Sequence, residues 1–194
     1  MGGRNKALLK LGENTFIERQ LREASLLSDD VVVVAGEPDF AEKLRAAGTA
    51  RVVADKYAGA GPLAGVQAGF AAAAHPLVWL LGCDQPYASA AVARMLLQRM
   101  DSASGALAAI PRIGYRLQPL HAVYRQEAGT SAEALLLAGE RKMQSWLERF
   151  DRLVVEESEL QALGQPLSFA DDIDTPEQYE QAIASWAETK GDRK

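Results

Sequence analysis

Cysteine, histidine and long apolar runs are scarce in this sequence. Its 194 residues hold one cysteine, Cys83, and two histidines. A single cysteine excludes an intramolecular disulfide and a cysteine-built structural zinc site, and it suits a reducing compartment. No apolar run approaches the ~18 residues of a membrane span, and the first residues lack the apolar core of a signal peptide. We therefore expect a cytoplasmic protein with no membrane partner.

Basic charge is also in short supply. Lys and Arg number 21 against 26 Asp and Glu, which gives a formal net charge of −5. Proteins that bind nucleic acid usually carry a basic patch or stripe, so this balance argues against a nucleic-acid partner. An anionic ligand must instead meet local donors, such as one lysine, backbone N–H groups or a bound cation.

Apolar residues make up 48% of the chain, and no flexible linker or internal repeat divides them. We predict a single domain over residues 1–188, followed by a charged tail over 189–194. The apolar runs at 30–36 and 76–84 are typical of strands buried on two faces, and helical patterns lie between such runs. This alternation predicts the α/β class: a doubly wound, mostly parallel sheet with helices on both faces.

Asp84 is the first candidate for a functional residue. Ligands of open parallel sheets bind beyond the carboxyl ends of the strands, and Asp84 follows an apolar run directly within the stretch C-D-Q-P. A carboxylate there suits Mg²⁺, which usually takes one or two protein carboxylates together with phosphates and water. The alternative is structural, with Asp84 capping the next helix or closing a turn. Cys83 beside it is predicted to be a small core residue.

A glycine-rich segment over residues 55–65 is the second candidate. It reads D-K-Y-A-G-A-G-P-L-A-G, follows a predicted strand and leads into a helix. Such a segment either presents backbone N–H groups to an anion or is a turn that packs through small residues. Asp55 at its start is likewise either a turn residue or an acceptor for a base or sugar. The segment matches neither the dinucleotide nor the P-loop fingerprint.

Two further places carry charge that a phosphate or a metal can use. Lys6 is either a point charge for a β- or γ-phosphate or a solvated surface lysine. Asp171, Asp172 and Asp174 lie just before a predicted helix. Asp174 or Thr175 caps that helix, or one of the three acids supplies a second carboxylate to a metal.

The order of these segments resembles a known family. M-G-G-R-N-K-A-L-L, V-V-A-D with G-A-G-P-L-A-G, C-D-Q-P, Q-P-L-H-A-V-Y and D-I-D-T-P-E-Q follow one another as in the MobA-like nucleotidyltransferases, most closely the molybdenum cofactor guanylyltransferases. The resemblance implies a Rossmann-like domain that transfers GMP from Mg-GTP to molybdenum-bearing molybdopterin. The products would be pyrophosphate and the guanine dinucleotide cofactor.

The resemblance also implies roles for three residues. Lys6 matches the phosphate-binding lysine, Asp55 an acidic residue of the GTP site, and Asp84 the Mg²⁺ ligand. Lys6 and Asp84 would be the catalytic pair, because transfer of this kind needs alignment and charge neutralisation more than a protein nucleophile. Mg²⁺ is the implied cofactor, GTP and molybdopterin are the substrates, and molybdenum-insertion and molybdoenzyme-maturation proteins are candidate partners.

Two departures from the family leave alternatives open. The first strand and glycine-rich phosphate loop are missing apart from residues 1–3, so we expect a late start site and, since that strand is central, a gap in the sheet. The stretch D-I-D-T-P at 172–176 replaces an N-I-N-T-P-like one. The alternatives are a cytidylyl- or sugar-phosphate nucleotidyltransferase of the same fold, and a non-catalytic assembly protein that lacks the phosphate loop.

Overall fold

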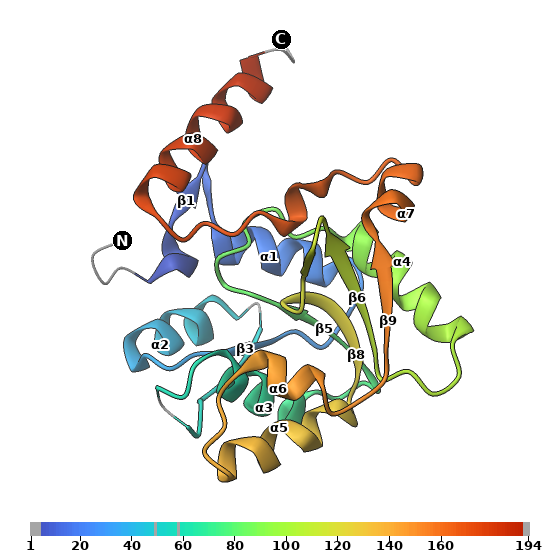
Figure 1. Cartoon of the computed structure of the whole chain (residues 1–194). Helices are drawn as coiled ribbons and strands as arrows, with labels where there is room; N and C mark the ends of the chain where they lie inside the picture. Colours follow the sequence, from blue (N-terminus) through green and yellow to red (C-terminus); the bar gives the residue numbers. More distant parts are fainter. Residues whose placement is uncertain (1–4, 49, 58, 192–194) are drawn as a thin grey trace.

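The computed structural model describes residues 5–48, 50–57 and 59–191; residues 1–3, where the phosphate loop was expected to end, lie outside them. Helices and strands alternate along the chain (Figure 1). The elements are η1 (Lys6–Leu8), β1 (Lys10–Leu11), β2 (Asn14–Thr15), α1 (Phe16–Ser25), β3 (Val32–Val34), α2 (Pro38–Ala47), β4 (Arg51–Val53), α3 (Pro62–Ala72), β5 (Leu77–Leu81), α4 (Ala90–Ser102), β6 (Ala108–Ile113), β7 (Arg116–Leu117), β8 (His121–Arg125), α5 (Ala128–Leu137), α6 (Met143–Leu147), β9 (Arg152–Glu156), α7 (Glu157–Ala162), η2 (Leu167–Ala170) and α8 (Pro176–Gly191).

Local sequence signals account for where the helices begin and end. Thr15 Oγ1 accepts the Glu18 N–H at 3.3 Å while Glu18 Oε2 accepts the Thr15 N–H at 2.7 Å, which is a capping box at the start of α1. α2 begins with Pro38 and ends at Gly48, whose φ of 68° favours glycine. The Ser89 side chain accepts from the Val92 N–H and so caps α4.

The larger sheet is mostly antiparallel, so the prediction of a mostly parallel sheet was wrong. Its strands follow the order β5-β8-β6-β7, and β9 pairs with β6. β8 runs antiparallel to both β5 and β6, because the chain returns from β6 through the β7 hairpin without a crossover helix. Helices separate the strands of the two parallel pairs, β6 with β9 and β3 with β4.

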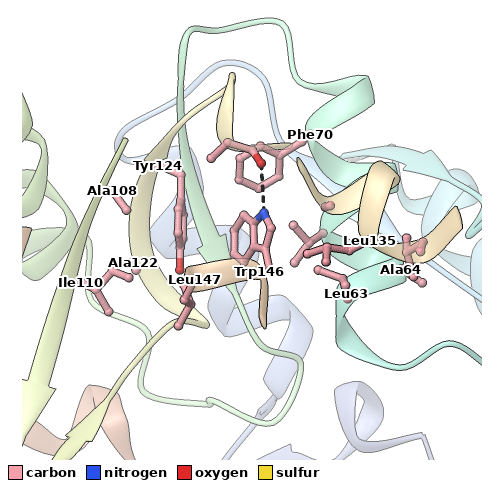
Figure 2. Close-up of a cluster of buried hydrophobic side chains, with 14 of the residues drawn as sticks. Leu63, Ala64, Phe70, Ala108, Ile110, Ala122, Tyr124, Leu135, Trp146 and Leu147 are labelled. Atoms are coloured by element: carbon pink, nitrogen blue, oxygen red, sulfur yellow. Dashed lines mark hydrogen bonds between the residues drawn. The ribbon is translucent and has the colours of Figure 1, made fainter. Parts of the chain in front are cut away.

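Helices cover both faces of this sheet, as predicted for the α/β class. One face packs against α3, α5 and α6 around a cluster of aromatic rings, and the other packs against α4 and α7. Tyr124 and Trp146 are fully buried in the first cluster, and Trp146 Nε1 donates a hydrogen bond to the Ala128 carbonyl at 2.9 Å (Figure 2). Alternation along the strand explains the division, since Ala108 and Ile110 face the first cluster and Ala109 faces the second.

The larger sheet and the small β3–β4 sheet are not hydrogen-bonded to each other. Among the described strands, β3 pairs with β4 alone and β5 pairs with β8 alone. A cavity of ≈ 730 Å³ lies between them, with α1 and α3 forming its other walls. Gly65 and Gly69 of α3 line it, and its far end reaches Gly82, Cys83 and Asp84.

The N-terminal hairpin and the last helix pack together beside α1. Leu11 and Phe16 pack with Ile173 and Ala182, which joins the β1–β2 hairpin and α1 to α8 (Figure 1). α8 continues past residue 188 to Gly191, so the helix crosses the expected domain boundary. In the described ranges, no helix combines the length and apolar character needed to cross a membrane.

Candidate active site

The candidate site is built on the turn that follows β5. The Gly82 N–H donates to the Leu120 carbonyl at 2.9 Å, and the Gln85 N–H donates back to the Gly82 carbonyl at 3.4 Å. A Cβ at residue 82 would lie 2.8 Å from Asp84 Oδ1 and 3.3 Å from Leu120 Cβ. Glycine at 82 therefore leaves room for the Asp84 carboxylate to fold back over it, and a larger residue would displace that carboxylate. Cys83, predicted to be a core residue, is exposed in this turn.

Lys6 and Asp84, which the resemblance implies as the catalytic pair, lie close together. Lys6 Nζ is 3.8 Å from Asp84 Oδ2 and donates a hydrogen bond of 2.5 Å to Asp174 Oδ1. The side chains of Lys6 and Asp84 are 26% and 23% exposed, whereas that of Asp174 is 60% exposed. The ammonium group thus bridges two carboxylates that are 90 residues apart in the sequence (174 − 84).

The environment shifts the pKa values of this pair. Burial acts to lower the pKa of Lys6, but the hydrogen bond to Asp174 and the charges of Asp174 and Asp84 outweigh it, so the pKa is raised. Burial, followed by the charge of Asp172, raises the pKa of Asp84 above its usual range despite the opposing charge of Lys6. An additional cation would relieve the repulsion that Asp84 experiences.

The segment 171–174 packs directly against the turn after β5. The Ile173 N–H donates to the Asp84 carbonyl at 3.0 Å, and Gln85 Nε2 donates to Asp172 Oδ1 at 3.0 Å. Of the two caps predicted for α8, Thr175 is the one used, since its Oγ1 accepts the Gln178 N–H at 3.2 Å. The Asp174 side chain is thereby left to pair with Lys6.

Two buried glutamines support the turn, and neither was a candidate from the sequence. Gln20 of α1 donates through Nε2 to the Gly82 carbonyl at 2.5 Å and to the Gln85 carbonyl at 2.9 Å. Gln85 accepts the Gly82 N–H through Oε1 at 3.3 Å. Both side chains are almost fully buried. The only sequence signal was the position of Gln85 directly after Asp84, because Gln20 reads as an ordinary helix residue.

Asp55 lies outside the Lys6–Asp84–Asp174 cluster. It follows β4 of the small sheet, and its Oδ1 accepts the Tyr57 N–H at 2.7 Å, which closes a local turn. The glycine segment after it leads into α3 through Gly61, whose φ of 75° favours glycine, and no side chain caps this helix. The N–H groups at the start of α3 are thus not occupied by a capping side chain.

Comparison with known proteins gives the family. The sequence model of the MobA-like NTP transferase domain matches residues 1–155. A probable molybdenum cofactor guanylyltransferase of Natronomonas pharaonis is 32% identical over 187 residues, which is 94% of this chain and 90% of that protein. The molybdenum cofactor guanylyltransferase of Burkholderia ambifaria is 34% identical over 162 residues, which is 80% of this chain and 79% of that protein.

A solved structure shows the same fold. The crystal structure of molybdopterin-guanine dinucleotide biosynthesis protein A from Archaeoglobus fulgidus superposes with a TM-score of 0.82 at 26% identity, covering 96% of this chain and 92% of that one. The family match spans well over half of the sequence, and the relatives above 30% identity are covered over more than two thirds of their length. The chain belongs to the MobA-like NTP transferase family and is a nucleotidyltransferase.

Proposed function

We propose that this protein is a molybdenum cofactor guanylyltransferase that transfers GMP from Mg-GTP to the phosphate of molybdenum-bearing molybdopterin. The relatives named for this activity support the reaction class. The observation that carries the proposal is the convergence of Lys6, Asp84 and Asp174 at the carboxyl end of β5. Ligands of open α/β sheets bind beyond the carboxyl ends of the strands, and β5, β6 and β9 of this sheet run in one direction. Delivery of the product to molybdoenzyme-maturation proteins stays a prediction.

The reaction asks little covalent chemistry of the protein. An oxygen of the acceptor phosphate bonds to the α-phosphorus of GTP, the α–β bridging bond breaks, and pyrophosphate leaves with the electron pair. Lys6 supplies a positive charge that binds the leaving phosphates and stabilises the charge that develops on them. Asp84 would hold a cation beside the phosphates, which would help to fix the position of the triphosphate.

The residues present fit a divalent metal. Carboxylate oxygens are the ligands that Mg²⁺ prefers, and Asp84 and Asp174 already lie on either side of one cationic group, the Lys6 ammonium. Asp84 would hold the ion, together with phosphate oxygens and water. Bound Mg²⁺ would supply further charge neutralisation at the phosphates.

The start of α3 is the proposed position for the rest of GTP. Its uncapped N–H groups suit an anion or a close approach of a ligand to the backbone, with Asp55 contributing an acceptor for base or sugar donors. One oxygen of the Asp55 carboxylate, Oδ1, accepts the Tyr57 N–H. Its second oxygen is the one we assign to the nucleotide.

The test is pyrophosphate release from Mg-GTP with molybdopterin as acceptor. Asp84→Asn keeps the size of the side chain but removes the charge that holds the metal, and we expect activity to fall on the order of 100-fold or more. Glu42→Gln, an exposed charge neutralisation on α2, is the matched control and should keep wild-type activity. Thermal denaturation of each variant verifies that it is folded.

The same assay separates the alternatives. The acidic pair in D-I-D-T-P is the specific observation that favours a different nucleotide or acceptor, because Asp174 contacts Lys6. Activity with CTP and not GTP, or with a sugar 1-phosphate in place of molybdopterin, would replace the proposed substrates. Calorimetry that detects no Mg-GTP binding to the wild-type protein would leave the non-catalytic reading instead.

A further inference from the structure

Gln85 is the most completely buried polar side chain next to the candidate site. It is 2% exposed, and its amide makes one hydrogen bond as an acceptor and one as a donor. Burying an amide without partners is costly, so a glutamine at this place is stable only because both ends are bonded. Its two hydrogen-bond partners therefore indicate the role of this buried side chain.

The two bonds of Gln85 join separate segments. Its Oε1 holds the Gly82 N–H within the turn after β5, and its Nε2 holds the Asp172 carboxylate of the segment before α8. The Ile173 N–H bonds to the Asp84 carbonyl alongside it. Asp172 and Ile173 are thus hydrogen-bonded to Gln85 and Asp84, respectively.

These two hydrogen bonds place the negative charge of Asp172 near Asp84. Asp172 is half-buried, and its carboxylate lies close enough to be the largest charge effect on Asp84. Two carboxylates held together repel one another until a cation arrives between or beside them. A hydrogen-bonded partner that orients such a group typically changes metal affinity by 10- to 100-fold when it is removed.

We propose that Gln85 is a positioning residue: it holds Asp172 beside Asp84 and so sets the affinity of the site for Mg²⁺. The inference rests on the proposed function, because the ion is the one assigned there to Asp84. Gln85 itself acts only through Asp172. Gln20, which bonds to the backbone of the same turn, fixes the turn but does not reach a carboxylate.

A double-mutant cycle tests this role. Gln85→Met keeps a similar length but removes both hydrogen bonds, so Asp172 is no longer held beside Asp84. Asp172→Asn keeps the size of the partner side chain and removes the charge that Gln85 holds. Gln85→Leu serves as a second variant if Gln85→Met does not fold.

The measurement is the Mg²⁺ concentration that gives half-maximal pyrophosphate release at saturating GTP, together with direct Mg²⁺ titration of the GTP-bound protein by calorimetry. We expect Gln85→Met and Asp172→Asn each to raise this concentration by roughly 10- to 100-fold, with a smaller loss of kcat at saturating Mg²⁺. Because Gln85 acts only through Asp172, the double variant should lose little more than either single variant in both assays. Thermal denaturation of all variants shows whether stability changes instead.

Each outcome bears on the proposal. A folded Gln85→Met protein with wild-type Mg²⁺ dependence, or a double variant in which the two single losses add, overturns it. A loss of stability without a change in Mg²⁺ affinity assigns Gln85 a purely structural role and also overturns it. Wild-type protein that neither turns over GTP nor binds Mg²⁺ overturns the proposed function together with this inference, so the two failures are distinguishable.

Discussion

The two sheets of this molecule are supported very differently. β6 and β8 of the larger sheet are largely buried and hold Tyr124 against Trp146 in a cluster of edge-on and tilted rings (Figure 2). β3 and β4 of the small sheet are only half-buried or exposed. The cavity of ≈ 730 Å³ lies along the inner edge of the small sheet, between β3 and β5.

The candidate site lies on the boundary between these regions. Asp84 follows β5, the strand of the larger sheet that faces the cavity. Lys6 lies in η1 and reaches Asp84 from there. The next residue of η1, Ala7, packs with Ile17 and Ala35 on the side of the small sheet. One half of the site is thus anchored in a dense core, and the other half in a looser one. Regions with fewer buried contacts are the ones expected to open locally.

The largest expected loss of stability comes from removing a buried ring on the larger-sheet side. Trp146→Ala removes a fully buried ring that contacts Phe70, Tyr124 and Phe150, and it also removes the Nε1–H donor to the Ala128 carbonyl. We expect the free energy of unfolding to fall by about 3–5 kcal/mol, because the rigid surroundings cannot collapse into the space. Urea denaturation measures the change.

Phe40→Ala is the matched test on the small-sheet side. Phe40 is buried with Ala41 and Leu44 in a cluster that includes Ile17 and Leu21, two residues on the wall of the cavity. We expect a loss near the low end of the same range, about 3 kcal/mol, since neighbours beside open space can shift. An equal or larger loss than for Trp146→Ala would show that the two sides are equally rigid.

The next prediction concerns how the stability of the larger-sheet side depends on pH. Burial lowers the pKa of His121 from 6.5 to about 4, and its Nε2 accepts the Ser89 N–H at 3.1 Å, which only a neutral ring can do. The unfolded chain therefore binds a proton that the folded protein excludes. The contribution of neutral His121 to the free energy of unfolding is therefore complete above pH 6.5. It is lost as the pH falls toward 4, and the total loss is about 3 kcal/mol.

His121→Gln provides the control for this titration, because its amide oxygen can accept from Ser89 without taking up a proton. Urea denaturation at a series of pH values should show a steeper acid loss for the wild-type protein than for the variant. Parallel curves would mean that other groups, such as the carboxylates of the site, govern the acid transition.

The sequence predicted local structure well and long-range pairing poorly. The capping box at Thr15 and the glycine at Gly48 are short-range signals that can be read from the sequence, and they mark helix ends in the structure. The antiparallel insertion of β8 between β5 and β6 depends on contacts that no local pattern encodes. Strands alternating with helices favour a parallel sheet, but the β6–β7 hairpin overrides that preference.

The candidate site shows the same division. Lys6 and Asp84 were predicted as a pair from the resemblance, and the structure places them 3.8 Å apart; their roles in catalysis stay predictions. Gln85 and Asp172 meet only because the last helix returns to the turn after β5. A buried glutamine has no distinctive spacing, so its importance emerges from its two hydrogen bonds and its burial.

The smallest expected effects come from a pair of identical changes, Gly129→Ala in α5 and Gly65→Ala in α3. A Cβ at 129 would lie 2.5 Å from Phe70 Cβ, and the Phe70 ring is held by Tyr124 and Trp146. We expect this variant to lose about 1–3 kcal/mol through overpacking.

A Cβ at Gly65 meets nothing within 4 Å, because it points toward open space on the α3 wall of the cavity. Alanine is a better helix former than glycine, so we expect Gly65→Ala to gain about 0.5–1 kcal/mol. Both changes add one methyl group to a helix, and denaturation in urea should therefore separate them by sign. If Gly65→Ala destabilises the protein instead, the wall between β3 and β5 closes in solution, and the contrast between a dense and an open side does not hold.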